Sequence, residues 1–137
     1  HYVAKKELFE KPLIRNFFYL MGGIPIDRKH PLNSLDSFKY IHYLLSRREY
    51  LVIFPEGTYF LNRMGPGKYR LIQLILKYQE ENRGQLPFVP IGIKYEERNW
   101  RQKVNITIGL PLYAKAEQGA EEFTRLIMAE IAQCCGF

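Results

Sequence analysis

Apolar side chains recur along the chain with two different spacings, and these spacings predict helices and strands in turn. Apolar residues three and four positions apart predict helices over residues 7–21, 31–48, 68–81 and 117–135. Continuous or alternating apolar runs between the helices predict strands over residues 1–4, 24–26, 50–54, 87–95 and 104–108. The resulting order, β-α-β-α-β-α-β-β-α, predicts an α/β fold with a mainly parallel sheet flanked by helices.

Local signals refine the ends of these elements. Pro12 suits an internal start within the first helix, because the first helical position needs no backbone donor. Asn33 or Ser34 is expected to cap the second helix through its side chain. The polar and charged residues 96–103 predict a loop between the last two strands.

The cluster Phe17-Phe18-Tyr19-Leu20 near the end of the first helix allows two interpretations. Its side chains could dip into a membrane interface, or they could pack against the sheet. Large apolar residues are most often found inside a protein, so the pattern favours buried packing.

The most informative stretch is the run Leu51-Val52-Ile53-Phe54 followed by Pro55-Glu56-Gly57-Thr58. Four consecutive apolar residues suit a strand covered on both faces, and Pro55 cannot donate to a ladder, so pairing stops there. Glu56 then lies at the carboxyl end of a strand, where ligands bind in open α/β sheets. The same tetrapeptide also fits a simple turn, with Gly57 at a positive φ and Thr58 forming a side-chain hydrogen bond. The local pattern leaves both interpretations open.

Composition narrows the class of protein. The chain has 137 residues, 47% of them hydrophobic, which predicts a single folded domain rather than a disordered segment. Cys134 and Cys135 are adjacent and are expected to be free thiols. No run approaches the roughly 18 apolar residues that span a bilayer. The net charge of +6 favours anionic partners, which include phosphate groups, acidic lipid headgroups and nucleic acid.

Four segments, taken in order, resemble the glycerolipid acyltransferases of the 1-acylglycerol-3-phosphate O-acyltransferase family. They are Val3-Ala4-Lys5-Lys6-Glu7-Leu8, Gly23-Ile24-Pro25-Ile26-Asp27-Arg28, Phe54-Pro55-Glu56-Gly57-Thr58 and Val89-Pro90-Ile91-Gly92-Ile93. The resemblance implies one acyltransferase-like α/β domain over residues 1–137. Because the chain begins at His1 rather than Met, we expect the N-terminal part of that domain to precede it.

The resemblance also implies a reaction, in which a fatty acyl group moves from acyl-CoA or acyl carrier protein to a hydroxyl of a glycerol phosphate or lysophospholipid. It implies no metal and no bound cofactor, with the acyl thioester as cosubstrate. The family's base is the histidine of an H-x-x-x-x-D motif that precedes the first block. None of His1, His30 and His42 has an aspartate five residues later, so the catalytic pair is expected upstream of His1. Residues 1–137 alone are therefore predicted to be inactive.

What remains in this chain is the acceptor side. The resemblance implies that Arg28 binds the phosphate, that Glu56 and Gly57 contact the acceptor with a hydroxyl from Thr58, and that Pro90 belongs to the substrate site. The family usually continues with Arg-Ser after the threonine, whereas this chain has Tyr59-Phe60 and so lacks one expected phosphate ligand. Three basic residues could compensate from the following loop and helix start, namely Arg63, Lys68 and Arg70.

We therefore expect the acceptor-binding portion of an acyltransferase that works on the cytoplasmic side of a membrane. It would be peripheral, or anchored through segments outside this chain. An alternative is a non-catalytic domain of the same family that binds lipid headgroups. A nucleic-acid-binding module ranks last, because the basic residues are dispersed along the chain.

Overall fold

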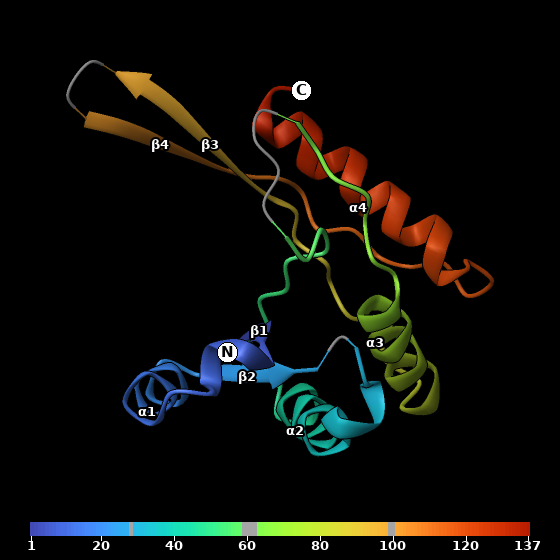
Figure 1. The fold of residues 1–137 in the computed structure, drawn as a ribbon. Helices are drawn as coiled ribbons and strands as arrows, with labels where there is room; N and C mark the ends of the chain where they lie inside the picture. The colour runs from blue at the N-terminus through green and yellow to red at the C-terminus, as the bar shows by residue number, and fades with distance from the viewer. Residues whose placement is uncertain (28, 59–62, 99–100) are drawn as a thin grey trace. The chain divides into compact units, whose positions relative to one another are not determined.

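The computed structural model describes residues 1–27, 29–58, 63–98 and 101–137. These residues form two compact units, His1–Phe54 and Pro55–Phe137, and each is described by itself (Figure 1). Each unit combines helices with paired strands, so the α/β class predicted from the alternation of elements is confirmed.

The first unit is built around a parallel pair of short strands. Strand β1 (Tyr2–Lys5) pairs with β2 (Gly23–Ile26), with Val3 opposite Ile24. The predicted strand at 50–54 adds one isolated parallel bridge between Val52 and Tyr2, in which the Val52 N–H donates to the carbonyl of His1 at 2.8 Å. The parallel pairing predicted for this part of the chain is thus present, although the third segment does not form a regular strand.

Two α-helices and two 3₁₀-helices complete the first unit. They are η1 (Lys6–Phe9), α1 (Pro12–Leu20), η2 (Pro31–Ser34) and α2 (Leu35–Ser46), and both α-helices contact β2 (Figure 1). Ile41 and Leu44 of α2 are buried together with Val3 and Ile24, as their helical spacing predicted. The helical segment predicted over 7–21 is present but divided, and α1 begins at Pro12, the internal start that the sequence indicated. The segment breaks at Lys11, which is extended (φ −82°, ψ 124°), because a residue that precedes proline disfavours the helical conformation.

The predicted burial of the aromatic cluster is also wrong, because α1 has no buried residue. Leu13, Phe17 and Leu20 are exposed, and only the opposite side of the helix, at Phe18 and Tyr19, packs against Phe9. In the parts of the chain that the structure describes, no helix has both the length and the apolar composition needed to cross a membrane.

Over its described residues, 55–58, 63–98 and 101–137, the second unit contains two helices and an antiparallel hairpin. The helices are α3 (Arg70–Glu81) and α4 (Ala120–Cys135), and the strands are β3 (Ile91–Arg98) and β4 (Arg101–Ile108). Phe123 of α4 is fully buried, and its ring meets that of Phe88 edge to face at 5.0 Å. Ile72 and Ile75 of α3 join the same core on the face that the sequence predicted.

The hairpin corrects the prediction that residues 96–103 form a loop. Pairing continues outward from Ile91 opposite Ile108 as far as Arg98 opposite Arg101. The polar residues are accommodated because they meet partners on the neighbouring strand: Glu96 lies 3.8 Å from the Nζ of Lys103 and accepts a 2.7 Å hydrogen bond from the Nδ2 of Asn105. The two strand pairs are separate sheets, a parallel one in the first unit and an antiparallel one in the second.

Helix α4 lies unusually close to β3, and a glycine makes this possible. A Cβ atom added at Gly92 would lie 2.5 Å from the carbonyl carbon of Cys134. The absence of a side chain at residue 92 thus allows the backbone of the helix to contact the backbone of the strand.

Candidate functional site

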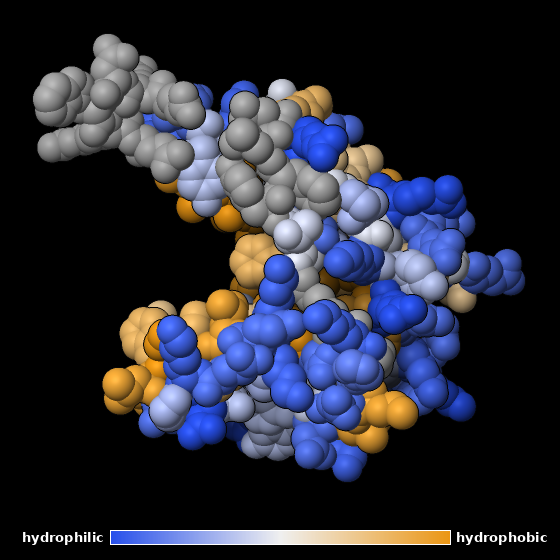
Figure 2. All heavy atoms as spheres, viewed as in Figure 1, coloured by the Kyte–Doolittle hydropathy of each residue, from blue (hydrophilic) through white to orange (hydrophobic). Residues whose placement is uncertain are grey.

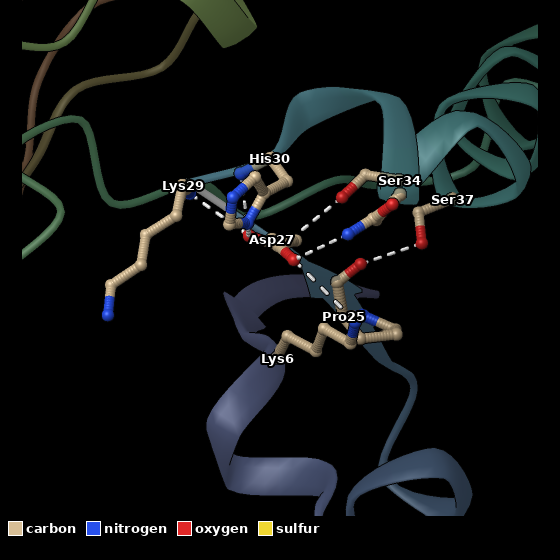
Figure 3. A network of polar contacts seen from close by, with 8 residues as sticks. Lys6, Pro25, Asp27, Lys29, His30, Ser34 and Ser37 are labelled. Atoms are coloured by element: carbon tan, nitrogen blue, oxygen red, sulfur yellow. Dashed lines mark hydrogen bonds and ion pairs between the residues drawn. The ribbon is translucent and has the colours of Figure 1, made fainter.

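The loop that follows β2 is held together by the carboxylate of Asp27 (Figure 3). Its Oδ1 accepts hydrogen bonds from the backbone N–H groups of Lys29 at 3.0 Å and His30 at 2.9 Å. Its Oδ2 accepts one from the Nδ2 of Asn33 at 3.2 Å, and the Nζ of Lys6 lies 3.6 Å away. One side chain therefore ties three positions of the loop to Lys6 at the start of η1.

These contacts keep Asp27 ionised. The backbone N–H of His30 and the side chain of Asn33 stabilise the charged form, which lowers the pKa of Asp27 from 3.8 to about 2. The carboxylate therefore remains an acceptor over the whole physiological pH range.

The same loop is joined to the start of α2 by two serines. The backbone N–H of Asp27 donates to the Oγ of Ser34 at 2.7 Å, and the Oγ of Ser37 donates to the carbonyl of Pro25 at 2.6 Å. Ser34 was predicted to cap the second helix, but it makes no side-chain cap hydrogen bond, because its hydroxyl already serves the loop. Asn33, the other predicted cap, is likewise bonded to Asp27.

Arg28, the predicted phosphate ligand, lies outside the described residues, so its role stays a prediction. Of its chain neighbours, Asp27 donates its backbone N–H to Ser34, and Lys29 donates its backbone N–H to Asp27. The sequence analysis did not assign Asp27 to the site. An aspartate that directly follows a strand, with a proline four residues later, was the available signal, since such aspartates commonly accept hydrogen bonds from the next backbone N–H groups.

His30 lies in this loop, but its geometry does not make it a base activated by Asp27. The Nδ1 of His30 is 3.9 Å from Oδ1 of Asp27, which is too long for a hydrogen bond, and its side chain is 73% exposed. His1 contacts the ring of Tyr40 edge to face at 5.7 Å, and His42 lies half-buried on α2. The location of the catalytic pair upstream of His1 remains a prediction.

In the second unit, the segment 55–58 holds a longer loop in place. The carboxylate Oε2 of Glu56 accepts a 2.8 Å hydrogen bond from the backbone N–H of Gly65, and the carbonyl of Pro55 accepts one from the N–H of Lys68 at 2.8 Å. Gly57 is buried at φ +69°, a conformation that favours glycine, as the turn interpretation predicted. The predicted contact of Glu56 with an acceptor hydroxyl stays a prediction.

The loop that Glu56 holds lines a cavity of about 460 Å³ that is open to solvent on one side. One wall is made by Gly65, Pro66, Gly67 and Tyr69, and the other by Glu121, Thr124, Arg125 and Met128 of α4. The two walls touch at Gly67, where an added Cβ would lie 2.6 Å from the Cγ of Met128. The lining combines apolar groups with the hydroxyls of Tyr69 and Thr124, the guanidinium of Arg125 and the carboxylate of Glu121.

The sequence analysis did not predict the wall that α4 provides, because the motifs on which the site prediction rested end at Ile93. Nothing local in the sequence of α4 indicates that Thr124 and Met128 face Gly67, since that contact joins two distant parts of the chain. A glycine-rich loop before a helix was the only signal, and it concerns one wall alone.

The remaining predicted residues are placed as follows. The side chains of Arg63, Lys68 and Arg70 are exposed, on the loop that Glu56 holds and at the start of α3. Thr58 is exposed, whereas Pro90 is buried, and the carbonyl of Pro90 accepts a 2.9 Å hydrogen bond from the N–H of Gly109. The structure thus brings Glu56, Lys68 and the cavity loop together in the second unit, and it places the Asp27 loop in the first.

A model of the acyltransferase family matches residues 1–94 of the chain, which include both loops. A 1-acyl-sn-glycerol-3-phosphate acyltransferase from Limnanthes douglasii is 31% identical over 102 residues, which cover 73% of this chain and 34% of that protein. The enzyme of the same name from Bacillus subtilis (strain 168) is 43% identical over 58 residues, or 42% of this chain and 28% of that protein. The chain thus spans about a third of the length of these relatives.

The fold has a counterpart of known structure. The crystal structure of the 1-acyl-sn-glycerophosphate acyltransferase PlsC from Thermotoga maritima matches 98% of this chain and 55% of that protein, with a TM-score of 0.66. The sequence identity over this match is 17%, so the likeness concerns the fold alone.

Proposed function

The chain belongs to the acyltransferase family, and on that premise we propose that it is the acceptor-binding portion of a glycerolipid O-acyltransferase. The whole protein would move a fatty acyl group from acyl-CoA or acyl carrier protein to a hydroxyl of a glycerol phosphate or lysophospholipid. Relatives that are named 1-acyl-sn-glycerol-3-phosphate acyltransferases support a phosphorylated glycerolipid as the acceptor.

The observation that carries this proposal is the contact between Glu56 and Gly65. It lies inside the region matched by the family, and it joins the Pro55-Glu56-Gly57-Thr58 turn to the loop that lines the cavity. A half-buried carboxylate that is already oriented can accept hydrogen bonds from glycerol hydroxyls without first being ordered. Gly57 supplies the positive φ that this turn requires without adding a side chain beside Glu56.

The loop around Asp27 supports the phosphate part of the proposal. Lys6, Lys29 and His30 lie on or beside this loop, in addition to the predicted ligand Arg28. Asp27 would act as a positioning residue, because its oxygens are occupied by the loop itself. A guanidinium presented from such a loop would bind a phosphate with two parallel N–H···O bonds.

The chemical step itself requires a base that we expect upstream of His1. That base would take the proton of the acceptor hydroxyl as its oxygen attacks the thioester carbonyl, and the thiolate would leave after the tetrahedral intermediate collapses. Residues 1–137 would bind and orient the acceptor during this step. We further propose that the whole protein works on the cytoplasmic face of a membrane, as a peripheral protein or anchored through segments outside this chain.

An acyl-CoA turnover assay with lysophosphatidic acid tests the proposal. It compares residues 1–137 with the whole protein, including any upstream H-x-x-x-x-D segment. We expect turnover only from the longer protein, since loss of a general base costs roughly 10²-fold to 10⁴-fold. Turnover by residues 1–137 alone would overturn the upstream assignment of the base. Inactivity of the folded whole protein toward several acceptors, combined with binding of their headgroups, would favour the non-catalytic lipid-binding alternative.

A further inference from the structure

Helix α1 carries an exposed apolar stripe made of Leu13, Phe17 and Leu20. These residues follow the i, i+4, i+7 spacing that places side chains on one face of a helix. Their exposed fractions are 86%, 60% and 88%, and Met21 continues the stripe at 61%. Figure 2 shows hydrophobic surface gathered over this end of the first unit. Contiguous apolar surface of this kind on a folded protein marks a contact with another surface.

The stripe is directed away from the unit to which α1 belongs. The opposite side of the helix faces inward, where the rings of Phe18 and Tyr19 lie 5.4 Å and 5.1 Å from the ring of Phe9. The helix is thus attached to the first unit by one face and offers the other face to its surroundings. A rotation that buried the stripe within this unit would break both ring contacts.

Charge indicates which kind of surface the stripe contacts. Four basic residues lie on α1 or just before it, namely Lys5, Lys6, Lys11 and Arg15, against two acidic residues, Glu7 and Glu10. Residues 1–54 hold nine of the 20 basic and five of the 14 acidic residues, and so carry four of the six net positive charges. A helix that is apolar on one face, with basic residues around it, is typical of one that lies in the interface of an anionic membrane.

We propose that α1 lies in the headgroup layer of an anionic lipid membrane, with Leu13, Phe17 and Leu20 directed toward the acyl chains. The role that we assign to this docking rests on the proposed function, because a lipid acceptor with an acyl chain is itself held in the membrane. The docked helix would keep the loop after β2 close to the membrane surface, since β2 begins two residues after Met21 in the sequence. The acceptor headgroup would then reach that loop without the lipid leaving the bilayer.

Flotation of the whole protein with vesicles tests this proposal without any need for turnover. The vesicles are made of phosphatidylcholine with or without phosphatidylglycerol. We expect the double variant Leu13→Ser/Leu20→Ser to bind anionic vesicles roughly 10-fold to 30-fold more weakly, which corresponds to partial burial of two leucines. The matched control is Leu110→Ser in the second unit, where the leucine is 83% exposed, and it should float like the wild type. The variant Lys11→Gln/Arg15→Gln should bind more weakly to vesicles that contain phosphatidylglycerol, whereas its binding to pure phosphatidylcholine vesicles should not change.

A second measurement applies even if another segment also anchors the protein. Phe17→Trp adds a fluorophore to the stripe, and lipids brominated on their acyl chains should quench its added fluorescence, whereas Leu110→Trp should give no such quenching. Wild-type flotation of the leucine double variant, together with no quenching at residue 17, would overturn the proposal. A fall in Tm or in oligomer mass for the double variant, at unchanged quenching, would instead show that another part of the protein or a second copy covers the stripe. A protein that docks through α1 but transfers no acyl groups would overturn the proposed function and leave this inference standing.

Discussion

The carboxylate of Glu56 accepts a hydrogen bond from the backbone N–H of Gly65 at 2.8 Å, and this contact orders one wall of the cavity. Removing it by Glu56→Ala should lower kcat/KM of the whole enzyme for lysophosphatidic acid by roughly 10-fold to 100-fold, the worth of one hydrogen bond to a charged group. Glu56→Gln keeps an oxygen that can accept the Gly65 N–H, so its loss should be several times smaller. Glu80→Gln on the exposed surface of α3 is the control.

Comparing Glu56→Gln with Glu56→Ala separates the role of Glu56 in anchoring the loop from its contact with the acceptor. If Glu56→Gln loses as much as Glu56→Ala, the charge of the carboxylate matters more than its bond to Gly65. Thermal unfolding of both variants shows whether either loss reflects a damaged fold.

Gly67→Ala should destabilise the second unit. The added Cβ would lie 2.6 Å from the Cγ of Met128 and 2.8 Å from the Cγ2 of Thr124, so α4 or the loop must shift, at a cost of about 1–3 kcal/mol for an overpacked contact. Denaturant unfolding measures this change. Gly84→Ala is the matched control, because an added Cβ there would lie 3.9 Å from its nearest neighbour, the carbonyl oxygen of Asn82. Met128→Ala combined with Gly67→Ala should recover part of the loss, and strictly additive effects would contradict a direct clash.

Stability should depend on the ionisation of Asp27 at acid pH. Its pKa is about 2 in the folded protein against 3.8 ordinarily, so the unfolded state binds the proton more readily. The stabilisation is therefore fully present above pH 4 to 5 and is lost as the pH falls through about 2. Unfolding measured across this range should show a shallower acid decline for Asp27→Asn. Asp36→Asn, whose side chain is fully exposed, should keep the wild-type decline, and identical profiles for all three proteins would contradict the prediction.

Arg28→Ala should weaken the use of a phosphate-bearing acceptor by roughly 10-fold to 100-fold in kcat/KM, the loss expected for one charge-assisted contact. The affinity for the acyl donor, measured by direct binding, should hardly change. Arg47→Ala, at the exposed end of α2, provides the control for a lost positive charge. Equal losses toward donor and acceptor would indicate a general disturbance of the fold and remove the phosphate role.

Helical periodicity correctly predicted the interior faces of three helices, since the apolar side chains that it placed on one face are buried in the structure. Ile41, Ile72 and Phe123 are all less than 2% exposed, as their spacing indicated. The same method failed for α1, because periodicity shows which residues share a face but not whether that face is turned inward. The hairpin was missed for another reason, since the pairing of Glu96 with Lys103 and Asn105 becomes visible only once the register of the two strands is known.

The candidate site divides in the same way. The turn at Gly57 and the loop closed by Asp27 depend on neighbours within a few residues, and both leave local traces in the sequence. The cavity depends on Gly67 meeting Thr124 and Met128, a contact between distant parts of the chain. Only tertiary packing decides such contacts, so composition and motif spacing could not predict them.

Gly67 lies against the middle of helix α4 and Gly92 lies against its end, and at each glycine the helix has no room to move closer. The helix is packed at both points, so moving α4 outward to enlarge the cavity would break its contact with β3. A bulkier occupant would have to be admitted by displacement of residues 63–67 instead. The size of ligand that this cavity accepts would then depend on how far residues 63–67 can move. The hydrogen bond between Glu56 and Gly65 limits that movement.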